Sequence, residues 1–223
     1  MISPHKMKTE NEFALAQYVG EVMRGHLSWM QLQPQKILET GCQSGEMLSA
    51  LQERYPFAQM IPEQHIVLDS ADLIMANLTL AWSNDSLHTL QKWRKQLRPN
   101  GLLMLTTFGL DTLTELPDRA MILPKLVDMH NVGDALVHAG FSDPVLEVEY
   151  VTLTYRSLEK LCYEMRATQM ILPEIQTLQL TTNDENIYSL TFEIIYAHAF
   201  ASEHYAADEM GEARIPISQI KRI

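Results

Sequence analysis

The sequence is poor in cysteine and in positive charge. Its 223 residues hold only two cysteines, Cys42 and Cys162, which make no disulfide framework, so a reducing, cytoplasmic compartment is expected. Lys and Arg number 17 against 28 Asp and Glu, and the net charge of −11 disfavours binding to nucleic acid. No apolar run approaches the roughly 18 residues of a membrane span. The polar N-terminus has no apolar stretch of the kind found in secretory signals. We therefore expect neither nucleic acid nor membrane as a partner.

The composition is that of an ordinary globular protein. Hydrophobic residues make up 46% and charged residues 20% of the chain, which excludes a disordered or collagen-like protein. The length suffices for a substantial core. We expect one domain over residues 1–223, with an N-terminal helical segment at 1–33 and a C-terminal extension at 201–223. No His, Cys, Asp or Glu spacing matches a metal site, and none is expected. The oligomeric state does not follow from the sequence.

Helical and β-prone segments alternate along the chain. Strands alternating with helices predict an α/β fold with a doubly wound, mostly parallel sheet. Residues 187–200 are expected to lie centrally in an antiparallel hairpin with the strand after Gly140. Helices are predicted at 11–32, 45–55, 87–97, 131–139 and 157–170, and strands at 36–41, 58–61, 66–68, 73–76, 102–107, 145–153 and 187–200.

The turn after the first of these strands, Glu39–Gly45, is the first place to look for a ligand site. Ligands of doubly wound sheets sit at the carboxyl ends of the strands. Gly41 and Gly45 permit close backbone approach, and the following helix offers free N–H donors. An ordinary strand–helix turn would explain the same glycines. Cys42 is open to two interpretations as well, a thiol with a lowered pKa at a helix N-terminus or a small residue that fills the turn.

Three motifs in order resemble the class I S-adenosylmethionine-dependent methyltransferases. They correspond to the cofactor loop, the fourth strand and the turn into the fifth strand of that superfamily. Further segments resemble one family within it, the malonyl-acyl-carrier-protein O-methyltransferases of the biotin pathway. The three motifs are ILETGCQSGEML, DLIMANLTLAWSND and LRPNGLLMLTTFG, and the further segments include LVDMHNVGDALVHAGF, VTLTYRSLEKL and YAHAF with GEARIPISQI.

The resemblance implies a Rossmann-like fold, S-adenosylmethionine as cofactor and the malonyl group of an acyl carrier protein as methyl acceptor. An ionised carboxylate is already a nucleophile, so positioning carries most of the rate and no catalytic triad is expected. The catalytic residues stay unassigned. In the family pattern, Glu39 supports the methionyl end of the cofactor, and Asn77 and Leu78 line the methyl-transfer cleft. The cofactor-binding residues implied are Glu39, Gly41, Cys42, Gly45, Asp69, Asn77 and Leu78.

The chain departs from the family in its cofactor loop and between the second and fourth strands. Gln43 replaces the middle glycine of the loop. The segment after Ile61 is too short for the family's helix and third strand, leaving Glu63 as the candidate for the ribose acid and Asp69 for the adenine-side acid. The N-terminal lid and the stretch Leu113–Val127, where the family places substrate contacts, are short too. These departures predict weakened cofactor affinity. They leave open the alternative of a non-catalytic, methyltransferase-like binding or assembly protein.

A basic cluster at the end of one predicted helix has two interpretations. Arg94, Lys95 and Arg98 could contact an acidic carrier protein. They could equally complement the negative end of the helix dipole.

Overall fold

The computed structural model describes residues 5–8, 14–41, 46–62 and 67–202, and its centre is one mixed sheet. Within these residues the strand order is β1-β7-β8-β5-β4-β2-β3, with β6 paired to β5. Strands β3, β2, β4 and β5 run parallel, and β8 is antiparallel to both β5 and β7. The strands are β1 (His5–Lys8), β2 (Lys36–Thr40), β3 (Gln59–Ile61), β4 (Ala71–Ala76), β5 (Leu97–Gly109), β6 (Leu126–Val127), β7 (Phe141–Tyr155) and β8 (Tyr188–Ala201).

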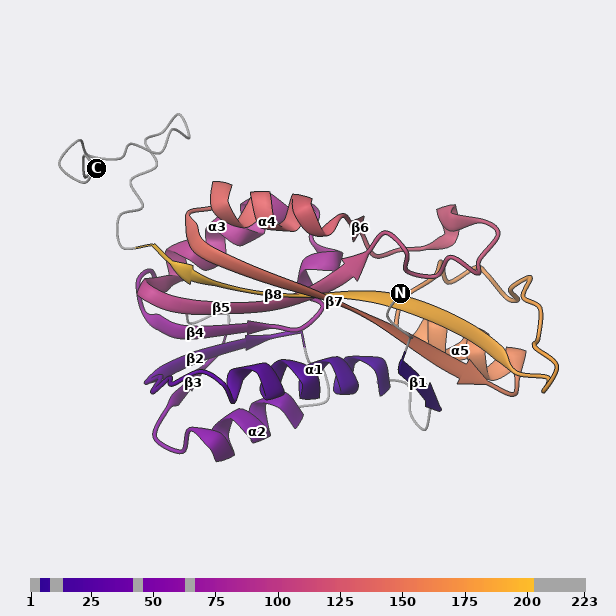
Figure 1. The fold of residues 1–223 in the computed structure, drawn as a ribbon, viewed down its shortest axis with the longest axis horizontal. Coiled ribbons are helices and arrows are strands. Elements are labelled where there is room, and N and C mark those ends of the chain that lie inside the picture. The colour runs from indigo at the N-terminus through magenta and orange to yellow at the C-terminus, as the bar shows by residue number, and fades with distance from the viewer. Residues whose placement is uncertain (1–4, 9–13, 42–45, 63–66, 203–223) are drawn as a thin grey trace, which may run out of the picture.

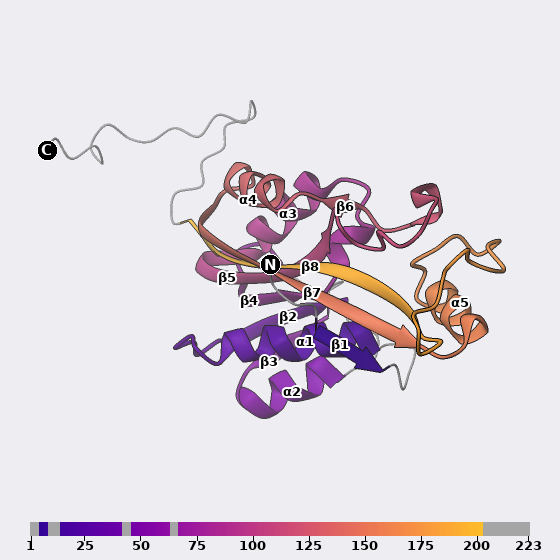
Figure 2. The ribbon, with the colours of Figure 1, turned by 45° about the vertical axis from the view of Figure 1, so that its right-hand side comes forward.

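Helices cover both faces of the sheet, as expected of a doubly wound fold. Helices α1 (Ala14–Leu27) and α2 (Glu46–Arg54) lie on one face, and α3 (Ser86–Gln96) and α4 (Met129–His138) lie on the other (Figure 1). Helix α5 (Leu158–Ala167) lies beyond the body of the sheet, where β7 and β8 extend away from their neighbours (Figure 2). The predicted doubly wound, mostly parallel α/β architecture is thus confirmed.

The local sequence accounts for these elements. Every residue of β4 is buried, as is typical of a central parallel strand covered on both faces. Helix α1 buries Val19, Met23 and Leu27 at successive four-residue steps. Asp85 and Ser157 cap α3 and α5, accepting hydrogen bonds from backbone N–H groups in the first turn. Each apolar run therefore lies against one of two buried clusters, one on each side of the sheet.

The connection between β3 and β4 is reduced, as the sequence predicts. Only residues 62–70 join these two strands, whereas a crossover between parallel strands usually takes a dozen or more residues. The described part of the link, Pro62 and residues 67–70, contains neither helix nor strand. The strand predicted at 66–68 is wrong in its described part, because Val67 and Leu68 are exposed and Leu68 lies in a turn.

Other predictions needed correction at their ends. The prediction for the final hairpin is confirmed, since β8 lies between β5 and β7 and pairs with β7 along nearly its full length. Strand β7 is longer than expected at both ends. Strand β1 was not predicted, because a four-residue edge strand in a polar segment carries no periodic signal. None of the helices in the described ranges is long and apolar enough to cross a membrane.

Candidate functional site

The carboxyl ends of β2 and β4 are joined tightly at Gly41. This glycine has φ of +103°, and a Cβ there would lie 2.2 Å from both Asn77 O and Thr79 Oγ1. Asn77 N and Thr79 Oγ1 each donate to Thr40 O over 3.0 Å. Gly41 is therefore required by the packing of the turn that follows β4. A larger side chain at this position is therefore expected to disturb the fold as well as any ligand site.

Glu39 brings a carboxylate to the same edge of the sheet. It is the penultimate residue of β2, lies beside Met75 of β4 and is partly buried. Side chains alternate between the two faces of a sheet along a strand. Leu38 and Thr40 therefore point to one face, and Glu39 points to the other, which α1 and α2 cover. Helix α2 begins at Glu46, shortly after this strand, so its free N–H groups point toward the same edge. The glycine turn and the start of α2 thus follow this carboxylate closely along the chain.

Asn77 holds α1 against the carboxyl edge of the sheet. Its side chain is 1% exposed. Its Nδ2 donates to Ala16 O over 2.8 Å, and its Oδ1 accepts from Thr106 Oγ1 over 3.0 Å. Both ends of the amide are thus used within the protein, so Asn77 positions other groups around the site.

Leu78 turns the chain out of β4 in an unusual conformation. It is a non-glycine residue with φ of 57° and ψ of 3°, in the left-handed region. Its N–H donates to Thr106 Oγ1 over 2.8 Å. A single-turn helix, Thr79–Trp82, follows and brings the half-exposed Trp82 to the rim. Strained backbone of this kind is concentrated at ligand sites.

A threonine on β5 is a member of this site that the sequence analysis missed. Thr106 is fully buried and connects Asn77 to Leu78. Thr107 is its buried neighbour on the strand. The signal was present as a Thr-Thr pair inside the apolar run of β5, where a polar side chain needs a buried partner.

A carboxylate and two phenols form a second group that sequence reasoning missed. The Tyr18 hydroxyl donates to Glu149 Oε1 over 2.5 Å, and the Tyr196 hydroxyl donates to Glu149 Oε2 over 3.0 Å. Burial raises the pKa of Tyr18, and the hydrogen bond to Glu149 raises it further. Burial also raises the pKa of Tyr196, with the charge of Glu149 as the next cause. Both phenols are therefore protonated at neutral pH and fix α1 to β7 and β8.

Asp69 is not brought to this site. It precedes β4, and its N–H donates to Lys95 O over 2.9 Å at the end of α3. Asn77 follows β4 at its other end, so Asp69 lies at the opposite edge of the sheet. Because strands in a parallel sheet point the same way, the residues before them lie far from the carboxyl edge. The structure thus groups Glu39, Gly41, Asn77 and Leu78 and leaves Asp69 apart, which argues against Asp69 as the adenine-side acid.

Four residues named from the sequence lie outside the described residues. They are Cys42, Gln43, Gly45 and Glu63. Among the described residues, no group of three or more His, Cys, Asp and Glu side chains is arranged to hold a metal ion.

The basic cluster at the end of α3 and the start of β5 is mostly structural. Arg94 is buried, and its guanidinium donates to Gly140 O and Ser202 O. Arg98 pairs with the buried carboxylate of Asp72. Lys95 is exposed, and it lies at the edge opposite Glu39.

Known proteins with similar sequences match most of this chain. The malonyl-[acyl-carrier protein] O-methyltransferase of Xylella fastidiosa is 31% identical, over 84% of this chain and 82% of that protein. The enzyme of the same name from Coxiella burnetii, its first form, is 29% identical over 92% and 88%. The chain belongs to the malonyl-[acyl-carrier protein] O-methyltransferase family. No family model matches it.

Solved structures agree with this family at the level of the fold. The YcgJ protein of Bacillus subtilis superposes with a TM-score of 0.55 at 10% identity, over 82% of this chain and 99% of that one. An S-adenosylmethionine-dependent methyltransferase of Archaeoglobus fulgidus gives a TM-score of 0.50 at 10% identity, over 83% and 94%.

The comparison also confirms that this family member is shortened. The alignment with the Xylella fastidiosa protein spans 241 positions but includes only 84% of the 223 residues, about 187. Some 54 positions of that alignment therefore have no counterpart in this chain. In the structure, the link between β3 and β4 is short for a crossover between parallel strands.

Proposed function

We propose that the protein is an S-adenosylmethionine-dependent O-methyltransferase that methylates the free carboxyl of malonyl-acyl-carrier protein in biotin synthesis, in the cytoplasm. The observation that carries the proposal is family membership together with the intact carboxyl edge, where Glu39, Gly41 and the N-terminus of α2 come together. The shortened segment begins at the carboxyl end of β3, the last strand in the sheet order.

The described residues fit the methionyl half of the cofactor. Glu39 offers a carboxylate for an ammonium or hydroxyl group, and the α2 N-terminus offers N–H groups for a carboxylate. The residues that would hold the ribose and adenine are not among them, since Asp69 lies at the opposite edge and Glu63 is outside the described residues. When bound, S-adenosylmethionine supplies an electrophilic methyl group on a sulfonium, which an ionised carboxylate can accept by direct displacement.

The chain's own contribution to such a reaction is positioning. Asn77 and Thr106 fix the end of β4, and Leu78 turns the chain so that the Thr79–Trp82 helix forms a wall. Tyr18 and Glu149 hold α1 from the other side. Because the acceptor carboxylate is already ionised at neutral pH, no general base is required.

Lys125 is the cation best placed to meet an acidic acceptor. It is exposed, its N–H donates to Ala81 O over 2.7 Å, and its Nζ donates to Asn84 O. These contacts place it beside the Thr79–Trp82 helix, at the carboxyl edge. It also belongs to the 113–127 stretch, where the family resemblance implies substrate contacts. In a chain with net charge −11, such a local cation favours approach of an acidic carrier protein.

Calorimetric titration with S-adenosylmethionine and with its demethylated product tests the cofactor assignment. Glu39→Gln should weaken affinity about tenfold to a hundredfold, because a charged hydrogen bond contributes about 1.5–3 kcal/mol. Asp69→Asn is the matched control, a carboxylate removed at the opposite edge, and should leave affinity unchanged. Absence of binding by the wild-type chain would support the non-catalytic alternative. Equal losses of affinity in the two variants would show that the cofactor site is not at the edge where Glu39 lies.

A further inference from the structure

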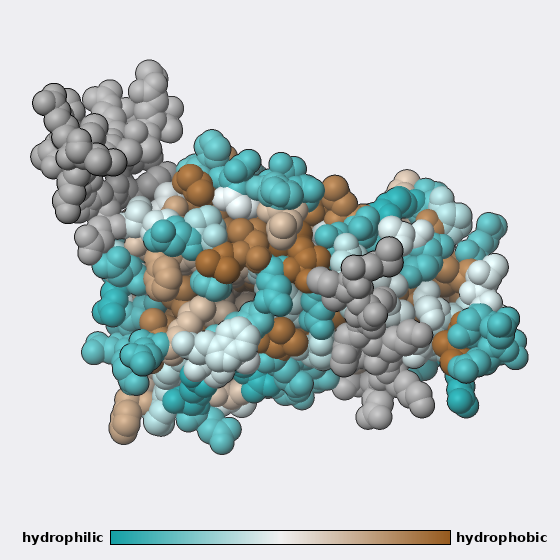
Figure 3. Space-filling model, in the orientation of Figure 1, coloured by the Kyte–Doolittle hydropathy of each residue, from teal (hydrophilic) through white to brown (hydrophobic). Residues whose placement is uncertain are grey.

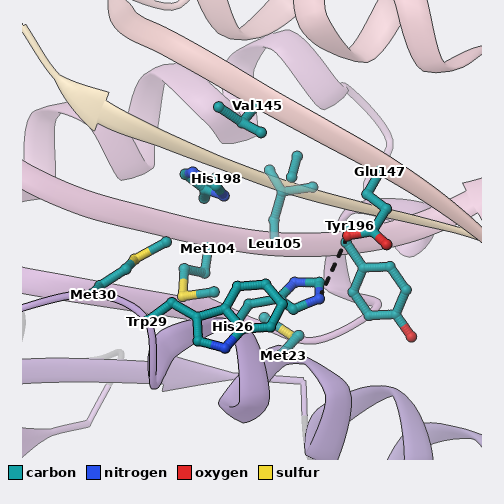
Figure 4. A pocket seen from close by; sticks show the side chains of 11 residues that line it. Met23, His26, Trp29, Met30, Met104, Leu105, Val145, Glu147, Tyr196 and His198 are labelled. Carbon is teal, nitrogen blue, oxygen red and sulfur yellow. Dashed lines mark ion pairs between the residues drawn. The ribbon is translucent and has the colours of Figure 1, made fainter.

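A separate cavity of about 340 Å³ opens between the C-terminal end of α1 and strand β7. Figure 4 shows His26 and Trp29 from the α1 side facing Val145 and Glu147 from β7, with Met104 and His198 behind them. Figure 3 shows apolar residues gathered on the same face, between α4 and α1. The lining is completed by Met23, Met30, Leu105, Tyr196 and Ala197.

This cavity lies away from the cofactor edge. Ala16, near the start of α1, bonds to Asn77 at the carboxyl edge, whereas Leu27 O accepts from Arg54 at the end of α2. His26 is ten residues beyond Ala16, which is about 15 Å along the helix axis. The cavity therefore belongs to the opposite end of α1, and the methyl-transfer site proposed above does not use it.

The walls combine aromatic rings, an apolar floor and a carboxylate at the rim. Trp29 is 79% exposed and stacks on His26 with ring centres 5.2 Å apart. Glu147 Oε2 lies 3.5 Å from His26 Nε2, and the Glu147 side chain is 65% exposed. Val145 adds an exposed apolar side chain on the β7 side.

Aromatic faces beside a carboxylate favour a cation, and the apolar floor of the cavity favours an aliphatic side chain. The volume is at the lower end of the range for small-molecule pockets, and it suits one or two side chains of a peptide.

The chain leaves the described structure close to this cavity. His198 lines the cavity, and β8 ends three residues later at Ala201. The next residue, Ser202, is held firmly. Its carbonyl accepts from the buried Arg94, and its hydroxyl donates to Gly140 O over 2.9 Å. The position from which the remaining chain departs is thus fixed at the same end of the sheet.

The sequence that follows is divided by charge. Residues 203–213 contain four acidic residues and no Lys or Arg, whereas residues 214–223 contain three basic residues and no acidic one. The second half also carries four isoleucines in ten residues, in the sequence RIPISQIKRI. Basic groups beside aliphatic ones are the chemistry that the cavity and its rim favour, and the acidic half would be repelled by Glu147.

We propose that the segment Arg214–Ile223 docks in this cavity of its own chain, with isoleucine side chains on the Met23–Met104 floor and its cations facing Glu147. The eleven residues 203–213 act as the tether. They can span up to about 36 Å, more than the roughly 13 Å of strand between His198 and Ser202. A tether of this length gives an effective concentration near the millimolar range, so even weak contacts keep the segment docked. The inference does not depend on what the protein methylates.

Fluorescence quenching by acrylamide tests the docking in the full chain. The protein has three tryptophans, of which Trp93 is 2% exposed. In a Trp82→Phe background, quenching therefore reports mainly on Trp29. The double variant Ile217→Asp/Ile220→Asp should raise the quenching constant about twofold or more, because releasing a segment held by tethering uncovers the indole. The matched control, Ala206→Asp/Ala207→Asp, alters the tether only and should leave quenching unchanged. Unaltered protection of Trp93 in every variant shows that the fold is intact.

Charge reversal tests the orientation. Lys221→Glu/Arg222→Glu should release Trp29, and adding Glu147→Lys should restore its protection, since the two reversals bring opposite charges together again. Identical quenching with and without the isoleucine substitutions would overturn the proposal. Protection that depends on protein concentration, with a dimer mass by light scattering, would assign the cavity to the segment of a second copy and would also overturn it.

Discussion

The side-chain amide of Asn77 donates to the backbone carbonyl of Ala16 over 2.8 Å, and this bond ties the start of α1 to the end of β4. The same amide accepts from Thr106 on β5. Three elements far apart in the sequence thus meet on one buried side chain, immediately beside the residues that resemble a cofactor cradle. The arrangement makes the geometry of the site depend on a residue that is itself fully engaged within the protein.

Asn77→Ala should lower the free energy of unfolding by about 1–3 kcal/mol, because it leaves buried partners unsatisfied. Urea unfolding followed by circular dichroism measures this. Asn131→Ala is the matched control, since Asn131 is exposed on α4 and its loss should change little. Equal stabilities of the two variants would contradict the bridging role of Asn77.

Gly41→Ala should destabilise the whole protein as well as any ligand site. Its new Cβ would lie 2.2 Å from Asn77 O, a backbone atom with little freedom to move, and φ at this residue is +103°. Gly25→Ala provides the comparison, because nothing lies within 4 Å of a Cβ there and the helix should gain roughly 0.5–1 kcal/mol. Thermal unfolding of both variants would separate the two effects. A Gly41→Ala protein as stable as the wild type would show that the turn can relax.

The pKa of the Tyr196 phenol is raised in the folded state by burial and by Glu149, from the ordinary value of 10.0. The unfolded chain therefore loses this proton first as pH rises. Its contribution to stability is complete below pH 10 and falls above it, by up to about 1.4 kcal/mol per pH unit. Urea unfolding at pH 8 and pH 11 should show a steeper loss for the wild type than for Tyr196→Phe. Parallel losses in the two proteins would contradict the raised pKa.

Lys125→Glu should raise the KM for malonyl-acyl-carrier protein about tenfold, equivalent to about 1.4 kcal/mol, with little change in kcat, because the residue attracts the acceptor and takes no part in bond making. Lys95→Glu carries the same charge change to the opposite edge and should leave KM unaltered. Steady-state kinetics at low and high salt measures both. If Lys95→Glu has the larger effect, the carrier protein docks at the other edge.

The sequence was sufficient to predict the order of the main elements because their apolar residues recur at regular spacing. The pairing of β8 was also predictable, because β8 is a long β-prone run that can form a hairpin with the strand after Gly140. The strand expected at 66–68 was wrong, because an apolar run as short as Ile-Val-Leu does not reveal whether it is buried. Strand β1 depends on pairing with the distant β7, which no local pattern indicates.

The candidate site was predictable only in part. Glu39 and Gly41 follow from a motif within one turn. Asp69 was expected near the cofactor but lies at the opposite edge of the sheet. The sequence did not show that β4 begins only at Ala71, after this residue. The Tyr18–Glu149–Tyr196 group joins positions 131 and 47 residues apart, so only the fold reveals it.

Intact-mass measurement of the acceptor tests the central claim most directly. Purified chain, S-adenosylmethionine and malonyl-acyl-carrier protein are incubated together, with acetyl-acyl-carrier protein, which lacks a free carboxyl, as the control. The account predicts that the malonyl form alone gains the mass of one methylene group, and that Glu39→Gln slows this gain. A malonyl-acyl-carrier protein whose mass is unchanged, at concentrations of cofactor that saturate calorimetric binding, would contradict the proposed reaction.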